Sequence, residues 1–161
     1  MISKLIRLIA ALDSKNGIAA GGHMPWHIPA DLARFNDLTT SHGANILIGN
    51  NTYRSIGHAL ANRHNYVLTH NNDQIMKDAV AVNDLNKLIN NFHGDLWVIG
   101  GEQVYAQTIN FADELYLTII DHDYHCDQFF PDYRTSFLLV SSEGPYSHNG
   151  IHFSYQLLEK I

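Results

Sequence analysis

Short apolar segments alternate with more polar, helix-like segments along most of the chain. The apolar segments predict strands at 4–12, 45–49, 65–69, 79–82 and 96–100, and later at 114–121, 136–142 and 152–160. The segments between them predict helices at 30–40, 51–57, 84–93 and 102–111. Strands that alternate with short helices are typical of a mostly parallel sheet with helices on both faces.

The last two predicted strands have no helix between them. They are separated by EGPYSHNG (143–150), which predicts a loop and an antiparallel hairpin at the edge of the sheet. The predicted fold class is α/β, with a mostly parallel sheet of about eight strands, a C-terminal antiparallel hairpin and helices on both faces. A length of 161 residues suits a single domain spanning 1–161.

Composition narrows the class of protein further. Hydrophobic residues make up 45% and charged residues 16%, as in a globular domain, and the net charge of −6 argues against a general binder of nucleic acids or anionic membranes. A single cysteine allows no intrachain disulfide. The longest apolar run near the N-terminus, Leu8–Leu12, is shorter than the core of a signal peptide. We therefore expect a cytoplasmic monomer without a membrane or nucleic-acid partner.

The stretch HDYHCD (122–127) contains residue types that bind metals. On a strand, His122 and His125 would point to opposite faces, which is poor geometry for one zinc ion. The sequence therefore predicts no metal site. Cys126 has no neighbouring base in the sequence and is predicted to be unreactive.

An unusual carboxylate lies in MPWHIPADL (24–32). On a helical wheel, Asp31 falls between Phe35 and Leu38, inside the apolar stripe of the predicted helix. One interpretation is an acid in the first helical turn that pairs with Arg34. The other is a carboxylate at the floor of an apolar cleft, where it binds a planar group with two N–H donors.

A second signal lies where apolar strands run into glycines and then helices. LWVIGGEQVY (96–105) places Gly100 and Gly101 at such a junction, where a backbone or a phosphate can approach closely. IGNNTYRSIG (48–57) has the same arrangement, with Asn51 and Thr52 as predicted caps of the helix. A tight turn without a ligand explains either stretch equally well.

Taken together, these motifs resemble the dihydrofolate reductase family over nearly the whole chain. The matching segments are LIAAL (8–12), MPWHIPADLARF (24–35), ILIGNNTYRSIG (46–57), R-x-N (63–65), VIGGEQVY (98–105), LYLTIID (115–121) and D-x-F-F-P (127–131). The resemblance implies the fold of that family and the NADPH-dependent reduction of 7,8-dihydrofolate to tetrahydrofolate.

The resemblance also implies a role for individual residues around the pterin. Asp31 would bind its 2-amino group and N3–H, helped by Thr118, while Trp26 would pack beside it and hold a water. Ile9, Ala11 and Ile99 would line the pterin pocket; Leu32, Phe35, Ile56 and Leu60 would grip the aminobenzoyl ring; and Arg63 would clamp the glutamate carboxylate. Water would protonate N5 while a hydride passes from the nicotinamide to pterin C6.

A second set of residues would bind NADPH. The resemblance implies that Tyr105, Ala11 and Ile99 lie near the nicotinamide, and that Ile18, Ala19 and Met24 belong to a mobile loop that closes over it. Asp127 would receive backbone N–H groups of that loop. Around the phosphates and the adenosine, the implied residues are Gly49, Asn50, Asn51, Thr52, Leu68, Thr69, His70, Gly100, Gly101, Gln103 and Val104.

The chain departs from the family pattern where the 2′-phosphate is read. Asn50 stands where bacterial members usually have arginine, and Gln103 stands where a second basic residue is common. His64, Thr69, His70 and Asn71 are the residues expected to compensate in part. We still expect NADPH as the cofactor.

Two other functions stay open from the sequence. A reductase of the same fold that acts on a ribityl-pyrimidine would not need Asp31 in an apolar stripe beside Trp26. A non-catalytic nucleotide-binding module would explain the glycines but not the combination of Asp31, Arg63 and an apolar cleft.

Overall fold

The structure is a computed structural model that describes residues 4–70 and 76–161. Its strands are β1 (Ile6–Leu12), β2 (Gly17–Ala19), β3 (Asn45–Gly49), β4 (His64–Leu68), β5 (Val80–Val82), β6 (Leu96–Val98), β7 (Glu114–Ile120), β8 (Gln128–Phe129), β9 (Phe137–His148) and β10 (Ile151–Lys160). Its helices are α1 (Pro29–Thr39), α2 (Asn50–Ile56), α3 (Leu85–Asn91) and α4 (Glu102–Thr108), followed by the 3-10 turn η1 (Ile109–Phe111). Within the described residues, no helix is long and apolar enough to cross a membrane.

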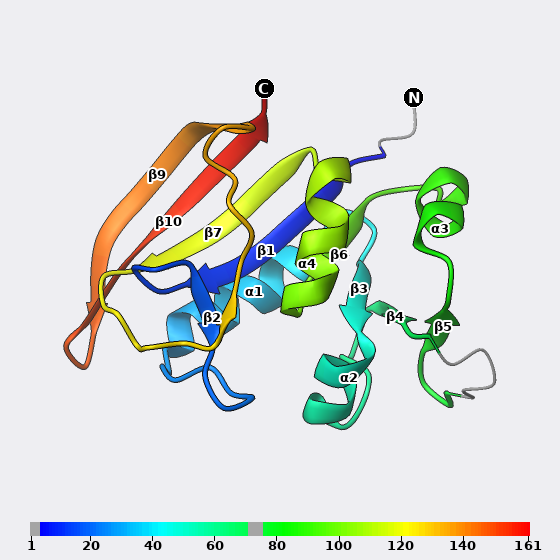
Figure 1. The fold of residues 1–161 in the computed structure, drawn as a ribbon, viewed down its shortest axis with the longest axis horizontal. Helices are drawn as coiled ribbons and strands as arrows, with labels where there is room; N and C mark the ends of the chain where they lie inside the picture. The colour runs from blue at the N-terminus through cyan, green and yellow to red at the C-terminus, as the bar shows by residue number, and fades with distance from the viewer. Residues whose placement is uncertain (1–3, 71–75) are drawn as a thin grey trace.

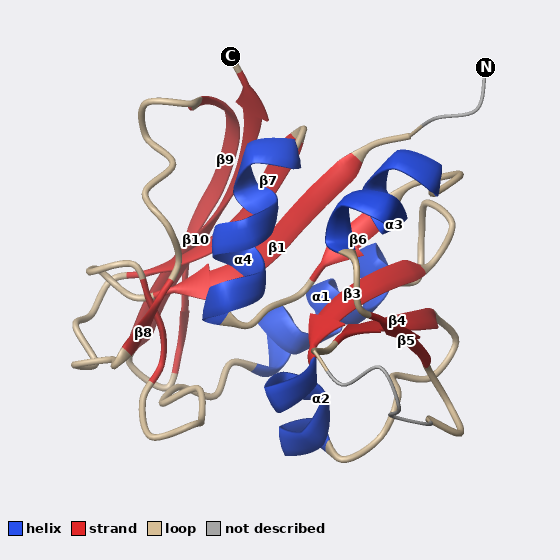
Figure 2. Ribbon diagram, turned by 45° about the vertical axis from the view of Figure 1, so that its right-hand side comes forward, coloured by secondary structure: helices blue, strands red, loops and turns tan. Residues whose placement is uncertain are grey.

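Eight strands form one sheet in the order β5-β4-β3-β6-β1-β7-β10-β9 (Figure 1). The six strands from β5 to β7 pair in parallel, and β10 is antiparallel to both β7 and β9. Helix α4 lies on one face of the sheet and α1 on the other (Figures 1 and 2). The predicted fold class is therefore confirmed. Because parallel strands end at the same edge, the residues that follow β3, β4, β5 and β6 lie along one edge of the sheet.

Strand β1 lies at the centre of the sheet and has apolar side chains on both faces. Leu8 and Leu12 are completely buried in the main core on one face, and Ile9 is buried in a separate cluster on the other, as expected for a parallel strand covered on both sides. A second, two-stranded sheet pairs β2 with β8 and was not predicted. Its strands have only three and two residues, which is too short for a periodic pattern to be recognised.

The antiparallel hairpin at the sheet edge is confirmed, but the predicted loop at 143–150 is wrong. Strand β9 continues to His148, and only Asn149 and Gly150 separate it from β10. The pairing slips at Gly144 and Pro145, where Gly144 has a φ of +112° and an extra residue is accommodated opposite β10. An edge strand tolerates proline at such a bulge, so Gly-Pro does not end the strand here.

A buried charge network ties the starts of three neighbouring strands together. The Arg7 guanidinium on β1 donates to Asp95 and to Glu114, each at 2.8 Å, and lies 5.4 Å above the ring of Trp97. Asp95 also accepts the backbone N–H of Leu5 at 2.8 Å. Burial by itself lowers the pKa of Arg7, but the two carboxylates outweigh it and the pKa lies above its usual value. The network therefore holds a permanent buried cation.

We expect Arg7→Met to lower the free energy of unfolding by about 3 kcal/mol, because the buried carboxylates lose their countercharge. Urea unfolding of both proteins measures this change. Lys4→Met is the matched control, because Lys4 is exposed, and it should change the stability by less than about 0.5 kcal/mol. A loss below about 1 kcal/mol for Arg7→Met would show that the network contributes little.

Candidate active site

Helix α1 carries the candidate carboxylate on its inner face. The helix begins at Pro29, whose fixed φ and missing N–H suit the first helical position. Asp31, Phe35 and Leu38 are partly buried, and Thr39 is fully buried. The helical wheel is therefore confirmed, since the acid lies among the residues that face the protein.

Asp31 is bound by a strand and not by its own helix. The Thr118 hydroxyl on β7 donates to Asp31 Oδ1 at 2.5 Å. Burial raises the pKa of the Asp31 carboxyl, while the Thr118 hydrogen bond and the nearby Arg34 charge oppose that rise. The side chain is thus held in a setting that disfavours its charge, which is common at functional sites.

The predicted alternative of an ion pair between Asp31 and Arg34 is wrong: none joins the two side chains, both of which the structure describes. The Arg34 guanidinium instead stacks on the ring of Tyr155, 4.1 Å from its centroid. Tyr155 on β10 pairs directly with Thr118 on β7. Successive turns of α1 therefore contact one cross-strand pair, Asp31 through Thr118 and Arg34 through Tyr155.

Two apolar clusters contain most of the residues predicted to surround a ligand. Ile9 is buried in one cluster, with Phe35, Leu60 and Ile99 packed against it. Trp26 is buried in the other, where Ala11 is packed against it. The Trp26 indole N–H is buried and has no acceptor among the described residues.

Two other predicted apolar residues, Leu32 and Ile56, belong to neither cluster and are 52% and 38% exposed.

Arg63 lies beside the C-terminal half of α1. Its guanidinium donates to Thr39 Oγ1 at 2.9 Å, to Asn36 Oδ1 at 3.2 Å and to the Ala61 carbonyl at 2.9 Å. It also lies 6.0 Å from the ring of Phe35. The structure therefore places this cation next to the apolar cluster that contains Phe35.

The two strand–glycine–helix junctions lie against each other between β3 and β6. The Gly49 N–H donates to the Gly100 carbonyl at 2.8 Å. A Cβ atom on Gly49 would lie 2.9 Å from a methyl group of Val104, and one on Gly101 would lie 3.0 Å from Thr52 Oγ1. Only glycine fits this close approach without a shift of the neighbouring side chains.

The first turns of α2 and α4 flank this junction. The expectation that Asn51 and Thr52 cap α2 is wrong, because the helix already begins at Asn50 and both residues lie inside it. The cap positions of α2 and α4 are Gly49 and Gly101, and neither can offer a side-chain acceptor. Both helices therefore start without a side-chain cap, a setting that suits an external anion.

Tyr105 connects the α4 side of the junction to the central strand. It is buried, and its hydroxyl donates to the Ile9 carbonyl at 2.6 Å. Burial raises its pKa, so the phenol stays protonated. The hydroxyl is therefore a fixed link between α4 and β1.

The remaining predicted cofactor residues lie along the same sheet edge or near it. Leu68 packs against the main core, Thr69 is buried, and His70 and Gln103 are exposed. Asn71 lies outside the described residues.

Of the predicted lid residues, Ile18 and Ala19 lie in β2, and Met24 ends the loop that follows this strand. Ala20 and His23 exchange two backbone hydrogen bonds, of 2.8 and 3.2 Å, around Gly21 and Gly22, which have φ values of +59° and +84°. The Gly21 N–H donates to Asp127 Oδ2 at 3.1 Å, which is the contact that the resemblance implies. Ile18 and Ala19 are partly buried, while Met24, at the end of the loop, is 61% exposed.

Cys126 has a carboxylate neighbour that the sequence did not reveal. Burial, together with a hydrogen bond to Asp13, raises the pKa of the Cys126 thiol to about 11, which agrees with the predicted low reactivity. Residues 121–127 form an irregular segment after β7. Within the described part of the chain, no group of three or more His, Cys, Asp or Glu side chains is arranged to hold a metal ion.

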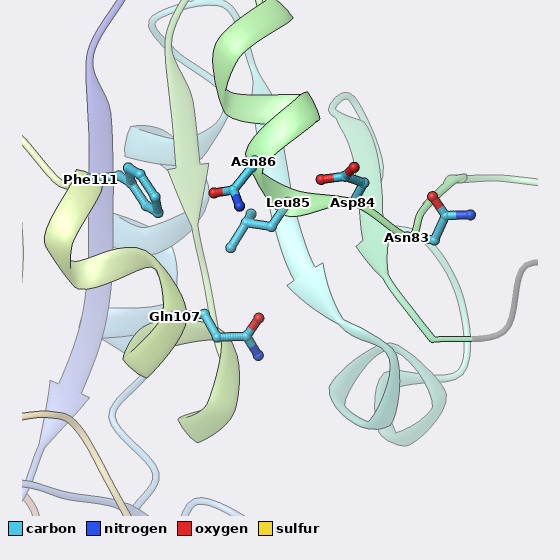
Figure 3. A pocket seen from close by; sticks show the side chains of 6 residues that line it. All are labelled: Asn83, Asp84, Leu85, Asn86, Gln107 and Phe111. Carbon is cyan, nitrogen blue, oxygen red and sulfur yellow. The ribbon is translucent and has the colours of Figure 1, made fainter.

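A surface hollow of about 590 Å³ lies between α3 and α4, away from Asp31 and the two apolar clusters (Figure 3). Asn83, Asp84, Leu85 and Asn86 come from the start of α3, and Gln107 faces the same hollow from α4. None of the residues predicted to bind a substrate or a cofactor lines it. The candidate site is therefore defined by the side-chain contacts described above and not by this hollow.

Comparison with known proteins agrees with this arrangement. The family model described as dihydrofolate reductase matches residues 5–160. The chain belongs to the dihydrofolate reductase family. It is 34% identical to dihydrofolate reductase of Bacillus subtilis (strain 168) over 157 residues, which cover 96% of this chain and 92% of the relative.

Two further members of the dihydrofolate reductase family extend the comparison. Dihydrofolate reductase type 3 of Salmonella typhimurium is 39% identical over 132 residues, covering 80% of each chain. The solved structure of dihydrofolate reductase from Enterococcus faecalis, complexed with NADP(H) and RAB-propyl, superposes with a TM-score of 0.85 at 25% identity. That match covers 97% of this chain and 96% of the other.

We expect Asp31→Asn to stabilise the fold near neutral pH. Because folding raises the pKa of this carboxyl, the folded protein retains the proton more strongly than the unfolded chain, and stability falls as the pH rises through the folded pKa. The asparagine side chain of the variant does not titrate, so the variant should gain stability over the parent near neutrality and lose that gain in acid.

Thermal unfolding over a pH series measures this difference. Asp37→Asn, on the exposed side of the same helix, is the matched control and should change the stability by less than about 0.5 kcal/mol. If Asp31→Asn is less stable than the parent at neutral pH, the contacts of the ionised carboxylate outweigh its burial.

Proposed function

We propose that the protein reduces 7,8-dihydrofolate to 5,6,7,8-tetrahydrofolate with NADPH, in one domain that spans residues 1–161. Membership of the dihydrofolate reductase family supports the reaction. The observation that carries it is the Asp31 carboxylate, held by Thr118 among apolar side chains. The pterin ring offers an amino group and an adjacent N3–H, and these two donors match the two oxygens of a carboxylate.

The side chains around Asp31 suit the rest of this substrate. Ile9, Ala11, Ile99 and Trp26 are positioned to line the pterin pocket, and the buried Trp26 N–H is a donor for an ordered water. Leu32, Phe35, Ile56 and Leu60 would contact the aminobenzoyl ring, and the exposure of Leu32 and Ile56 supports a position at its open side. Arg63 would bind the glutamate carboxylate with its planar fork of donors.

The glycine junction suits the diphosphate of NADPH. The starts of α2 and α4, which no side chain caps, would bind it, with Gly49, Asn50, Asn51, Thr52, Gly100, Gly101, Gln103 and Val104 around it. Leu68, Thr69 and His70 would contact the adenosine half, and Ile18, Ala19, Met24 and Tyr105 the nicotinamide half. The NADP(H) bound to the Enterococcus faecalis relative supports this assignment.

The chemistry follows from these placements. When bound, NADPH supplies the hydride for pterin C6, and the C6–N5 double bond becomes a single bond as N5 gains a proton. Water delivers that proton, while Asp31 orients the ring and its negative charge favours the protonated pterin. Trp26 and the lid residues exclude bulk water from the reacting atoms.

The alternative substrate, a ribityl-pyrimidine, receives no support from the relatives, because those described above are named dihydrofolate reductase. We further propose that the protein acts as a cytoplasmic monomer, without a nucleic-acid partner. The acidic net charge supports the last point.

Loss of NADPH absorbance in the presence of dihydrofolate tests the function directly. We expect Asp31→Asn to lower kcat/KM for dihydrofolate by about 10²-fold or more, because an amide cannot accept both pterin donors or supply the charge. Asp37→Asn is again the control and should keep the parent activity. Absence of turnover in the parent protein would contradict the proposed reaction, and full activity of Asp31→Asn would contradict the role of Asp31.

Asn50→Arg tests where the cofactor's 2′-phosphate binds. Residues 50–52, 69–70 and 99–105, which follow β3, β4 and β6 at this sheet edge, include no lysine or arginine. A new guanidinium beside a phosphate should tighten NADPH by about tenfold while leaving NADH nearly unchanged. Dissociation constants for both cofactors measure the effect, and equal changes would show that Asn50 does not face the 2′-phosphate.

A further inference from the structure

Glu102 is the first residue of α4, directly after the glycine pair. Its carboxylate does not turn toward the glycines. Glu102 Oε2 accepts the backbone N–H of Phe129 at 2.5 Å, across 27 residues of sequence. A charged acceptor on a backbone donor makes a strong hydrogen bond, so this contact fixes the segment around Phe129 against the start of α4.

The segment that Glu102 contacts also holds the lid, which comprises residues 18–24. Phe129 belongs to β8, which pairs with β2. On either side of Phe129, the Asp127 N–H donates to the Ala19 carbonyl at 2.9 Å and the Phe130 N–H donates to the Asn16 carbonyl at 2.8 Å. The Asp127 carboxylate in turn accepts the Gly21 N–H. Strand β8 thus lies between the base of the lid and the side chain of Glu102.

We propose that Glu102 is a positioning residue that fixes the lid relative to the glycine junction through the N–H of Phe129. The proposal rests on the proposed function, in which the lid residues contact the nicotinamide half of NADPH and the glycine junction binds its diphosphate. Glu102 would keep the lid aligned with the glycine junction, and so the nicotinamide contacts aligned with the diphosphate contacts. The neighbouring Phe130 ring also packs on Tyr105 of α4, with ring centroids 4.9 Å apart. Without the Glu102 contact, β8 and the lid would therefore loosen from α4 while this ring packing stays.

The charge of Glu102 has a separate effect. A carboxylate in the first turn complements the helix dipole, but it also lies in the turn that would bind a diphosphate, where it repels an anion. Glutamine keeps an acceptor oxygen for Phe129 and removes the charge. Alanine removes both. The two variants therefore separate the hydrogen bond from the charge.

Hydrogen exchange of the protein without substrate or cofactor tests the hydrogen bond. In Glu102→Ala we expect the amides of 14–24 and 127–131 to exchange about tenfold faster, with the sheet core unchanged. Glu102→Gln keeps a neutral, weaker acceptor and should exchange much more slowly than Glu102→Ala, close to the parent. Glu159→Ala and Glu159→Gln, at an exposed glutamate near the end of β10, are the matched controls and should leave both segments unchanged.

Phe129→Pro removes the donor while leaving Glu102 in place, and it should reproduce the exchange of Glu102→Ala. This variant also tests the proposal if Glu102→Ala does not fold. Parent-like exchange in 14–24 for a folded Glu102→Ala or Phe129→Pro would overturn the proposal. An equal increase in Glu102→Gln and Glu102→Ala would also overturn it, since the charge and not the hydrogen bond would then be responsible.

Kinetics supply the second test. Glu102→Ala should slow single-turnover hydride transfer by about tenfold, because the lid is misplaced. The KM for dihydrofolate should stay unchanged, because Asp31 and the apolar side chains around it are intact. Glu102→Gln should restore the rate and bind NADPH more tightly than the parent. A parent-like rate in Glu102→Ala would overturn the positioning role. Failure of the parent to turn over dihydrofolate would instead count against the proposed function, leaving the exchange result valid.

Discussion

The site depends on one hydrogen bond, between the Thr118 hydroxyl and the carboxylate of Asp31. A carboxylate among apolar side chains is costly, and burial raises its pKa accordingly. Helix α1 carries the acid, but the hydroxyl that donates to it belongs to β7. The packing of α1 against β7 therefore also sets the hydrogen bonding of the Asp31 carboxylate. Arg34 adds a second attachment one turn later, on Tyr155, and its charge helps to keep Asp31 ionised.

The other half of the site depends on close backbone approach and not on side-chain charge. The Gly49 N–H meets the Gly100 carbonyl, and Gly101 lies where a methyl group would press on Thr52. These contacts bring the starts of α2 and α4 together at the edge where the parallel strands end. The protein therefore combines a carboxylate held among apolar side chains with a glycine junction where two helix starts approach each other closely.

Periodicity predicted the sheet, the order of its strands and helices along the chain and the inward position of Asp31, because each of these depends on local spacing. It could not identify Thr118 as the partner of Asp31, since that contact depends on how α1 packs against β7. It also missed β2 and β8, which are too short to show a pattern and are held by contacts distant in sequence. Strand β9 was predicted too short because Gly144 and Pro145 resemble a loop, whereas an edge strand accommodates them at a bulge.

Arg63 illustrates how a surface cation can be prepared before any ligand arrives. Three hydrogen bonds, to Thr39, Asn36 and the Ala61 carbonyl, already restrict the rotation of a long side chain that would otherwise sample many conformers. An anion that meets this guanidinium loses little affinity to the ordering of the protein. Those bonds use Nε and Nη1, so an incoming anion would meet the two N–H groups of Nη2 at a fixed angle.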